Sequence, residues 1–312
     1  MAKKNKYINF SSSRQGSRHV KKSVLFAAAV LFIAVVAVAT FAVKAGTSKG
    51  TSAVTSSGSS AQSAAAITIS KSSSTQSQSN KPIKTTNSIP VLMYHSINYD
   101  PKNPTNILRV PKAKFAAEMK WLYDNGYTTL SLDEIYSAVS NNKPVAEKSV
   151  VLTFDDGYND NYDNALPVIK QYKFKATVFM ITARIDDSKN GYLTAAQIKE
   201  MDSSGMRIEC HTVDHPYLDT LSYKKQYSEL SDSKATLEAL LGRSVNFVAY
   251  PSGKYNADTI AAAKKIGYKL CFKMEGGIAK ISDSPYEFPR TFVGSDLQDF
   301  ISRVKGTATY NK

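Results

Sequence analysis

Two adjacent carboxylates follow a buried apolar run near the middle of the chain. Residues 150–154 read Val-Val-Leu-Thr-Phe, and Asp155, Asp156 and Gly157 come directly after them. A run that is apolar on both faces is typical of a strand in a parallel sheet, and such sheets carry their chemistry where the strands end. Gly157 allows a sharp turn, so both carboxylates can reach one pocket. The alternative is an ordinary solvated turn.

Two histidines four residues apart are the second candidate for chemistry. His211 and His215 follow a short apolar run that contains Met206 and Ile208. Two imidazoles at this spacing, joined by a carboxylate from elsewhere in the chain, can hold a divalent metal ion and leave coordination positions open. The chain has only four histidines, at positions 19, 95, 211 and 215, so a chance pair of surface histidines is the weaker interpretation.

Both stretches match the signature motifs of one enzyme family. Residues 153–157 read Thr-Phe-Asp-Asp-Gly, and residues 211–216 read His-Thr-Val-Asp-His-Pro. The chain therefore resembles the polysaccharide deacetylases of carbohydrate esterase family 4, the NodB-homology domain, over roughly residues 88–305. The resemblance implies that Asp156, His211 and His215 bind one divalent ion and that Asp155 is the general base. Zinc suits these N and O ligands best, and cobalt, nickel or manganese are alternatives.

The third motif of the family is altered in this chain. The family usually has Arg-x-Pro-Tyr-Gly, whereas residues 249–253 read Ala-Tyr-Pro-Ser-Gly. Pro251 is retained, and the backbone N–H of Ser252 could still serve an oxyanion. Ala249 removes the guanidinium group that would orient Asp155, and we expect Arg290 to supply it, a surface arginine being the alternative. This departure resembles the branch that includes the poly-N-acetylglucosamine deacetylases.

A general acid is predicted by elimination among the histidines. Many family members supply it from a Leu-x-His motif near the C-terminus, but no histidine follows His215 here. His95, which ends the apolar run at residues 91–94, is the remaining histidine of the domain and is predicted to protonate the leaving amine. The alternative is a buried histidine with a structural hydrogen bond. Tyr158 and Tyr250 are candidates for stacking on a sugar.

Two cysteines complete the candidates for reactive groups. Cys210 and Cys271 each lie at the end of an apolar run, so two buried free thiols are expected, and a disulfide is the alternative in an exported protein. The alternation of side chains along a strand turns Cys210 away from His211, so Cys210 is not expected to bind the metal.

Alternating strands and helices must position these residues. Apolar runs predict strands at residues 90–95, 150–154, 176–181, 207–210, 245–250 and 268–272. Helical spacing and caps predict helices at residues 112–125, 161–172, 194–205, 222–241 and 256–266, and a further short helix that begins with the capping box at residues 131–134. This alternation predicts a parallel α/β sheet, open or closed. The family resemblance implies a distorted (β/α) barrel with fewer than eight strands.

The front of the chain has a different composition. Of the net charge of +14, residues 1–45 carry +8 and residues 46–89 carry +4, so only +2 remains for the rest. We expect a basic cytoplasmic tail at residues 1–23. Residues 24–43 are apolar except for Thr40 and are long enough, at about 30 Å, to span a bilayer as a single-pass anchor. The preceding positive charge predicts an extracellular catalytic domain. A cleaved signal peptide, and hence a secreted protein, is the alternative.

A Ser/Thr-rich segment separates this anchor from the predicted enzyme. Residues 44–88 have no aromatic side chain and no periodicity, which predicts a disordered linker with a reach of about 35–40 Å. Residues 89–312 form the predicted catalytic domain. Its small net charge and lack of base-reading motifs argue against nucleic-acid binding, and no obligate protein partner is expected.

Three functions agree with these motifs to different degrees. The leading one is metal-dependent N-deacetylation of an extracellular N-acetylglucosamine polymer, either peptidoglycan or poly-N-acetylglucosamine. An O-acetyl esterase acting on a glycan such as xylan would use the same site. A non-catalytic glycan-binding protein is disfavoured, because Asp155, Asp156, His211 and His215 are all intact.

Overall fold

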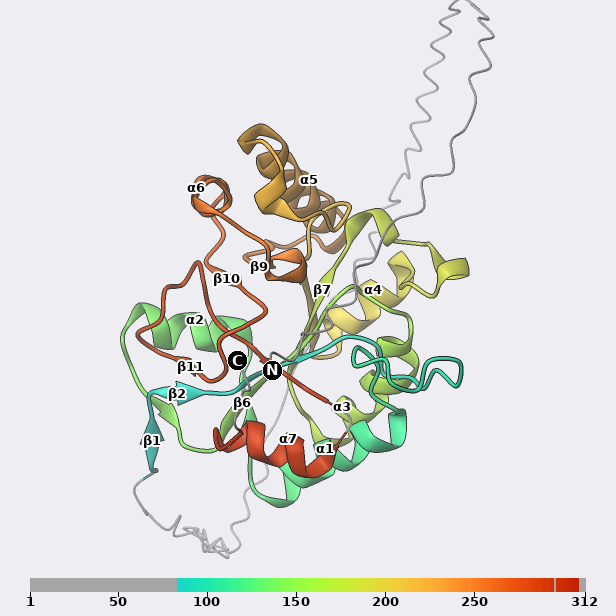
Figure 1. The fold of residues 1–312 in the computed structure, drawn as a ribbon, viewed down its shortest axis with the longest axis vertical. Helices are drawn as coiled ribbons and strands as arrows, with labels where there is room; N and C mark the ends of the chain where they lie inside the picture. The colour runs from blue at the N-terminus through green and yellow to red at the C-terminus, as the bar shows by residue number, and fades with distance from the viewer. Residues whose placement is uncertain (1–82, 295, 309–312) are drawn as a thin grey trace, which may run out of the picture. The chain divides into compact units, whose positions relative to one another are not determined.

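The computed structural model describes residues 83–294 and 296–308 (Figure 1). The predicted tail (residues 1–23), the predicted membrane segment (24–43) and most of the predicted linker (44–88) lie outside this part. Within it, no helix combines the length and the apolar character needed to cross a membrane. Ordered strands begin slightly before residue 89, because β2 (Ser88–Ile89) pairs with β11 (Ala279–Lys280) and buries Ile89 completely.

The centre of the domain is a curled sheet of parallel strands. Its hydrogen-bonded order is β10-β9-β8-β7-β6-β3-β12, and every pair along this path is parallel. These strands are β3 (Val91–Tyr94), β6 (Ser149–Phe154), β7 (Ala176–Met180), β8 (Met206–Cys210), β9 (Phe247–Ala249), β10 (Leu270–Phe272) and β12 (Thr291–Phe292). Short β4 (Thr128–Thr129) adds to β6, and β1 (Thr85–Thr86) pairs with β5 (Val145–Ala146). The predicted parallel α/β sheet is confirmed.

Alternate side chains of these strands enter two separate clusters of apolar residues. On β6, Val150 and Leu152 belong to the larger cluster beneath the helices, whereas Val151 belongs to a smaller cluster with Phe179 and Phe272. Strands that are buried on both faces need apolar residues at every position, which explains the unbroken apolar runs in the sequence. The smaller cluster fills the concave side of the sheet.

One extended segment connects the two ends of the curled sheet. The backbone N–H of Lys273, just after β10, donates to the carbonyl of Phe288 at 3.0 Å, and Val293 N–H donates to Met93 O on β3 at 3.3 Å. Residues 288–293 therefore touch both β10 and β3. The sheet is a curled parallel half-barrel, which agrees with the expected distorted barrel, and it has seven strands along its path with β4 as an eighth strand beside β6.

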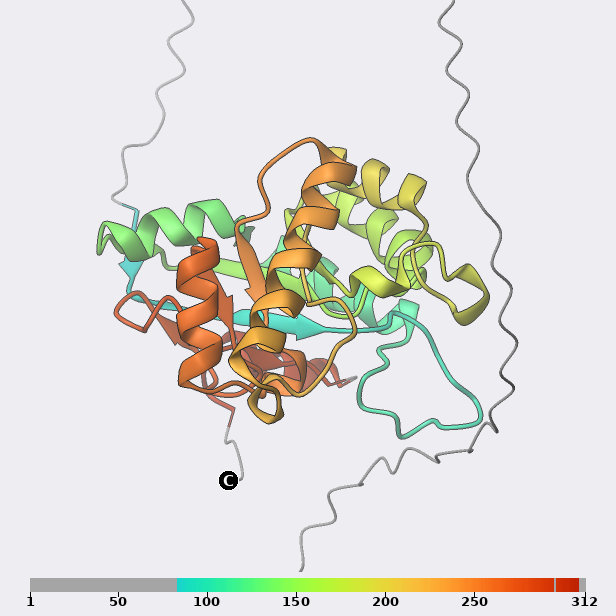
Figure 2. The same ribbon diagram turned by 90° about the horizontal axis from the view of Figure 1, so that it is seen from above.

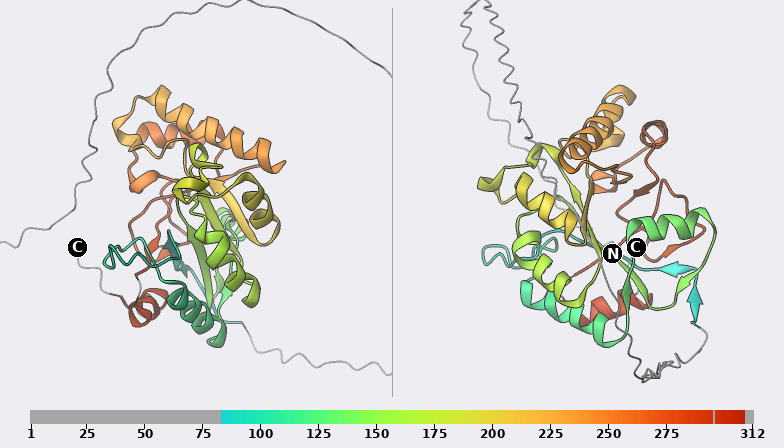
Figure 3. Two further views of the ribbon diagram at one scale, coloured as in Figure 1. Left: turned by 90° about the vertical axis from the view of Figure 1, so that its right-hand side faces the viewer. Right: turned by 180° about the vertical axis from the view of Figure 1, so that it is seen from behind.

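Helices cover the convex side of the sheet (Figures 1 and 2). Helix α5 packs against α6 and β8, and α1 packs against α3 and α7 (Figure 3). Helix α2 instead contributes Leu132 and Ile135 to the smaller cluster. The helices are α1 (Lys112–Asp124), α2 (Leu132–Ser140), α3 (Leu166–Tyr172), α4 (Ala195–Ser203), α5 (Tyr223–Leu241), α6 (Ala257–Ile266) and α7 (Leu297–Val304).

Local capping signals fix most of the helix ends. The capping boxes that begin at Ser131 and Thr194 are both present as predicted. The predicted helix at residues 161–172 begins with a π-helical turn, η1 (Asn161–Ala165), before α3. Helix α7 is not among the predicted elements, since its eight residues bury only Phe300 and Val304. Short 3-10 turns follow several strands: η2 (Thr182–Arg184), η3 (Ser188–Asn190), η4 (Leu218–Thr220) and η5 (Pro251–Gly253).

A buried carboxylate joins β8 to β9 where strand pairing is sparse. The two strands share one register pair, Cys210 with Val248. Below it, Glu209 accepts hydrogen bonds from the backbone N–H groups of Asn246 and Phe247 at 2.9 and 3.0 Å. Burial raises the pKa of Glu209 to about 7 despite the nearby Arg243. The two hydrogen bonds to Glu209 fix the spacing of the ends of β8 and β9, which lead to His211 and Ser252.

Candidate active site

Neighbouring strand ends bring the predicted site residues to one cavity. β3 leads into His95, β6 into Asp155 and Asp156, β8 into His211, and β9 into Ser252. These residues line a cavity of about 120 Å³ together with His215, Tyr250, Arg290, Leu108, Gly253 and Met274. At ~30 Å³ per water molecule, this space suits a group of about the size of an acetamide. Leu108 and Met274 were not predicted, because no motif marks them.

Three side chains form a cluster of potential metal ligands. An Asp156 carboxylate oxygen lies 3.5 Å from His211 Nε2 and 3.6 Å from His215 Nε2. One ligand atom from each of the three residues lies within 4.8 Å of the others. Ligand atoms bound tetrahedrally at 2.0–2.1 Å stand roughly 3.3 Å apart, so the separations of the Asp156 oxygen from the two histidine nitrogens are close to those that zinc requires.

Hydrogen bonds determine which histidine nitrogen faces the cluster. His211 Nδ1 lies 2.8 Å from the carbonyl oxygen of Ala249, and a carbonyl can only accept, so Nδ1 carries the proton. The lone pair of Nε2 therefore points toward Asp156, as in a metal-ligating imidazole. Burial and the neighbouring His211 lower the pKa of His215 to about 4, so His215 is neutral and ready to donate its lone pair.

The cluster residues adopt backbone conformations that are uncommon for side chains with a Cβ. Asp156, Thr212, His215 and Ser252 all have positive φ angles, at +74°, +65°, +58° and +53°. Such conformations persist only where the surroundings enforce them, and they collect at functional sites. Gly157 continues the turn at φ +81°, and a Cβ there would lie 2.1 Å from the sulfur of Met180. Glycine adopts this φ angle without strain, and any other residue would also have to displace the Met180 side chain.

Two side chains hold the loop that carries His215. Thr212 Oγ1 accepts from the backbone N–H of His215 at 3.1 Å, so Thr212 hydrogen-bonds within the loop as predicted. Glu229 on α5 accepts from the N–H groups of Val213 and Asp214, each at 3.0 Å. The role of Glu229 was not predicted, since no motif connects a helix residue to this loop.

Arg290 binds Asp155 directly. Its two terminal nitrogens donate to the two carboxylate oxygens at 2.6 and 2.7 Å, a bidentate pair in which both side chains are almost fully buried. Burial would raise the pKa of Asp155, but the charge of Arg290 outweighs it and the pKa lies below the ordinary value. The alternative of a surface arginine is therefore wrong: Arg290 is only 1% exposed.

His95 lies at the rim of the same cavity. Its Nε2 is 3.9 Å from an Asp155 carboxylate oxygen, and its Nδ1 is buried with no hydrogen-bond partner among the described residues. A purely structural histidine would have its ring nitrogens satisfied. Burial lowers the pKa of His95 and outweighs the opposing effect of Asp155, which makes the neutral imidazole the main form at neutral pH.

Residues just after the first motif hold the end of β3. Asn161 is fully buried, and its side-chain amide donates to the carbonyl of His95 at 2.8 Å. Asp160 accepts from Ser96 Oγ at 2.6 Å and from Ile97 N–H at 2.8 Å. These contacts were not predicted. The π-helical turn that begins at Asn161 is a local distortion that is frequent at functional sites.

The predicted sugar-stacking tyrosines differ in their environment. Tyr250 is fully buried, stacks on Tyr255 at 5.0 Å and donates its hydroxyl to Tyr286 O. The prediction that it offers a ring to the groove is therefore wrong, because the strand alternation that turns Ala249 inward turns Tyr250 under the helices. Tyr158 is half-buried and stacks on Tyr192 at 5.3 Å, and burial together with the charge of Asp156 raises its pKa.

Both cysteines are buried free thiols, as expected. Cys210 Sγ lies 3.1 Å from Ser233 Oγ on α5, on the helix side of the sheet. Cys210 is not part of the ligand cluster, which agrees with the alternation argument.

The cluster fits a divalent metal ion. Burial lowers the pKa of His211, but the carboxylates of Asp156 and Asp155 outweigh burial and raise it, so the cavity favours positive charge. Two imidazoles and one carboxylate are a familiar donor set for zinc, with positions left open for a substrate. The half-barrel and the ligand cluster, with the ionised Asp155 carboxylate beside it that is not one of the ligands, define a hydrolytic enzyme with a metal-type site.

Comparisons with known proteins agree on the family. Residues 142–271 match the family model described as polysaccharide deacetylase. The Bacillus subtilis (strain 168) protein YxkH, provisionally named a polysaccharide deacetylase, is 42% identical over 230 residues, which are 72% of this chain and 78% of YxkH. The Streptococcus pyogenes deacetylase PplD, solved in complex with acetate, is 36% identical with a TM-score of 0.66 and covers 70% of this chain and 98% of its own.

A third relative has a named substrate. The poly-beta-1,6-N-acetyl-D-glucosamine N-deacetylase of Staphylococcus aureus (strain MSSA476) is 29% identical over 213 residues, which are 63% of this chain and 72% of that protein. The chain belongs to the polysaccharide deacetylase family, carbohydrate esterase family 4, whose members depend on a metal ion. It is a polysaccharide deacetylase.

Proposed function

We propose that the protein removes N-acetyl groups from an extracellular polymer of N-acetylglucosamine, using one zinc ion held by Asp156, His211 and His215. The observation that carries the proposal is the bidentate pair of Arg290 with Asp155 beside the ligand cluster. This pair keeps one buried carboxylate ionised and oriented without using it as a ligand, which is what a general base requires.

The residues around the cavity can divide the reaction among them. A divalent ion held at the cluster would supply Lewis acidity, polarising the acetamide carbonyl and lowering the pKa of a neighbouring water molecule. Asp155 takes the proton of the attacking water as the water oxygen bonds to the carbonyl carbon. The backbone N–H of Ser252 stabilises the developing oxyanion. His95 delivers a proton to the nitrogen as the C–N bond breaks, which releases acetate and a free amine.

The relatives support the choice of substrate. A named poly-beta-1,6-N-acetyl-D-glucosamine N-deacetylase aligns with 63% of this chain. The related PplD structure contains acetate, the acid that this reaction would release. Ala249 in place of the third-motif arginine, with Arg290 in its spatial role, is the departure that resembles the poly-N-acetylglucosamine branch. We therefore favour this polymer over peptidoglycan.

Product analysis tests the proposal. The purified full-length protein would be loaded with zinc and incubated separately with β-1,6-linked N-acetylglucosamine polymer, chitin oligomers, purified peptidoglycan and acetylated xylan. We expect free amine and acetate in equal amounts from the first polymer, with a slower reaction on the others. Acetate release without new amine would instead identify an O-acetyl esterase.

We further propose that residues 24–43 anchor the protein in the cell membrane with the enzyme outside. Their apolar character and length, together with the basic residues before them, support this topology. Residues 44–82 would then tether the domain close to the membrane. Protease added to intact protoplasts should remove the catalytic domain and leave a short membrane-bound fragment. A fully soluble protein that begins near residue 46 would contradict the anchor.

A further inference from the structure

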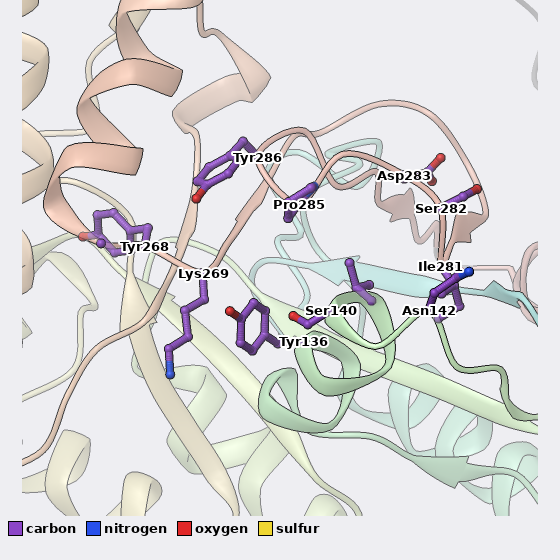
Figure 4. Close-up of a pocket in the computed structure, with 12 residues that line it drawn as sticks. Tyr136, Ser140, Asn142, Tyr268, Lys269, Ile281, Ser282, Asp283, Pro285 and Tyr286 are labelled. Atoms are coloured by element: carbon purple, nitrogen blue, oxygen red, sulfur yellow. The ribbon is translucent and has the colours of Figure 1, made fainter.

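A large hollow among the described residues lies away from the candidate active site. It has a volume of about 570 Å³ and is formed between α2, the residues that lead into β10, and the segment before Phe288 (Figure 4). We call it the tyrosine hollow and define it by Tyr136, Ser140, Asn142, Lys269, Asp283 and Tyr286. Ligand sites have volumes of roughly 300–1,000 Å³, so it is large enough for a ligand.

The tyrosine hollow lies at the opposite end of β10 from the catalytic cavity. Lys269, which lines the hollow, immediately precedes β10, whereas Met274, which lines the catalytic cavity, follows it. The two cavities share no lining residue. A ligand in the tyrosine hollow would therefore leave the catalytic cavity free.

The lining combines aromatic rings with small polar groups. Tyr136 on α2 and Tyr286 on the facing segment are each half-buried. A lysine lies over each ring: Lys269 Nζ is 5.5 Å from the centre of Tyr136, and Lys264 Nζ is 4.9 Å from the centre of Tyr286. These cation–π contacts limit the motion of the rings, which reduces the entropy lost when a ligand stacks on them.

Sugars present apolar C–H faces beside hydroxyl groups, and this lining matches both. Tyrosine rings accept the C–H faces, and Ser140, Asn142 and Asp283 offer hydrogen-bonding groups around them. The lining contains no histidine or cysteine. Its charged side chains are one lysine and one aspartate, which favours an uncharged glycan over an anionic or a cationic one.

A second hollow borders the first at Asp283, and two neighbouring hollows would suit a linear ligand. It has a volume of about 360 Å³, shares Asp283 with the tyrosine hollow and extends to Lys273 and Pro289. Lys273 is the neighbour of Met274 in the catalytic cavity, and its carbonyl accepts from Arg290 Nε at 3.2 Å. The lining of the second hollow thus extends from Asp283 in the tyrosine hollow to Lys273 at the flank of the active site.

We infer that the tyrosine hollow is an accessory binding site for an uncharged stretch of the glycan polymer whose other units reach the catalytic cavity. The identity of this glycan as an N-acetylglucosamine polymer rests on the proposed function. A weak second contact on the same chain raises the local concentration of acetamido groups at the active site. The gain applies only to chains long enough to reach both sites.

Substitution of the two tyrosines tests the inference. In an Asp155→Asn background, which prevents hydrolysis during the measurement, the double substitution Tyr136→Ala and Tyr286→Ala is expected to weaken binding of β-1,6-linked N-acetylglucosamine polymer about threefold to tenfold, the scale of one or two aromatic contacts. In the active enzyme, the same pair should raise KM for the polymer and leave amine release from a trisaccharide within about twofold of the parent.

Three controls keep the test decisive. Tyr123→Ala removes a 57% exposed tyrosine on α1 that lines neither hollow, and it should change nothing. Tyr136→Phe with Tyr286→Phe keeps the rings and should retain polymer binding. Dextran, an uncharged glucan without acetamido groups, measures how far binding at the tyrosine hollow extends to glycans other than N-acetylglucosamine polymers. The alanine variant keeps the Tyr286 backbone carbonyl that accepts from Tyr250, so the fold should survive.

Two outcomes would overturn the inference. One is unchanged polymer binding by the double alanine variant, and the other is an equal loss of activity on polymer and trisaccharide. If the parent enzyme releases no amine from any N-acetylglucosamine glycan, the proposed function fails, but the binding assay in the Asp155→Asn background still decides whether the tyrosine hollow holds a glycan.

Discussion

Arg290 and Asp155 form a buried bidentate ion pair although 135 residues separate them in the chain. The pair exists because residues 288–293 cross from β10 to β3 and pass beside the end of β6. Arg290 also donates to Thr153 Oγ1 at 3.3 Å and to Lys273 O at 3.2 Å, so its guanidinium group links the end of β6 to the residue that follows β10. The same side chain thus connects β6 with the segment after β10 and orients the predicted general base.

Arg290→Ala should therefore reduce turnover by at least about tenfold, or ~1.4 kcal/mol at the barrier. Asp155 would lose its orientation and remain as an unpaired buried charge, so the melting temperature should also fall. Metal content should change less than turnover, since Arg290 does not touch the ligand cluster. Arg184→Ala, which breaks a half-exposed pair with Asp187, is the matched control.

A second variant, which places an arginine at position 249, separates a loss of catalysis in Arg290→Ala from a loss of folding. Ala249 belongs to the same inner cluster of apolar residues that faces Arg290 and stands where the family motif has arginine. Ala249→Arg combined with Arg290→Ala should recover part of the lost turnover. An effect of Arg290→Ala below about twofold, which is well under 1 kcal/mol, would remove Arg290 from the mechanism.

His211→Ala should lose the metal ion and the activity together. His211 supplies an Nε2 that lies 3.5 Å from Asp156, and its loss leaves only two of the three ligands. Metal content by elemental analysis and amine release would both be measured, with circular dichroism to confirm the fold. His95→Ala is the control that should keep its metal. A His211→Ala protein with stoichiometric metal and full activity would contradict the assignment of His211 as a metal ligand.

His95→Ala should lower turnover by about 10²–10⁴-fold, the usual contribution of a general acid. Burial lowers the pKa of His95, so the protonated form is depleted as the pH rises through a value below the ordinary 6.5. The alkaline limb of kcat/KM in the parent enzyme should therefore begin below that pH, and His95→Ala should flatten it. A parent profile with no alkaline limb, or an unchanged limb in the variant, would contradict the role.

Asn161→Ala should reduce kcat by about threefold to thirtyfold without loss of metal, because the amide that fixes the His95 carbonyl is removed. The shift should appear in kcat more than in KM, since the substrate does not touch Asn161. Asn141→Ala removes a comparable hydrogen bond, from the Asn141 side-chain amide to Ser137 O on the surface, and serves as the control. Equal effects of both substitutions would leave Asn161 with a structural role alone.

Glu118→Gln should change how stability depends on pH. Glu118 is fully buried, accepts from the Tyr94 hydroxyl at 2.8 Å, and has its pKa raised to about 8 by burial. The folded protein therefore holds a proton that the unfolded chain releases above the ordinary value of 4.5, so the parent loses stability as the pH rises from about 4.5 to about 8. Glutamine cannot ionise, so the Glu118→Gln protein should not lose stability from this group as the pH rises.

Thermal unfolding of both proteins at several pH values measures the difference. The glutamine variant should gain stability relative to the parent between pH 5 and pH 8, by at most about 1.4 kcal/mol per pH unit. Other titrating groups are shared by the two proteins and cancel in the comparison. A constant difference across this range would show that Glu118 stays ionised in the fold.

The sequence alone determined the alternation of strands and helices and the two motifs that carry the chemistry. Apolar runs, capping boxes at Ser131 and Thr194, and turn residues act over a few neighbours, so they can be recognised without the fold. The resemblance of the two motifs to the family predicted Asp156, His211 and His215 as a set, and the structure places the three side chains together where parallel strands end.

Only the tertiary structure decided which distant residues complete the site. The curvature of the sheet brings residues 288–293 beside β10 and β3, and no local pattern encodes that curvature. The structure therefore chose between a surface position and the Asp155 pair for Arg290, placed Asn161 under His95, and buried Tyr250 beneath the helices. Local side-chain chemistry selects candidates, whereas the way the sheet curls determines which of them meet.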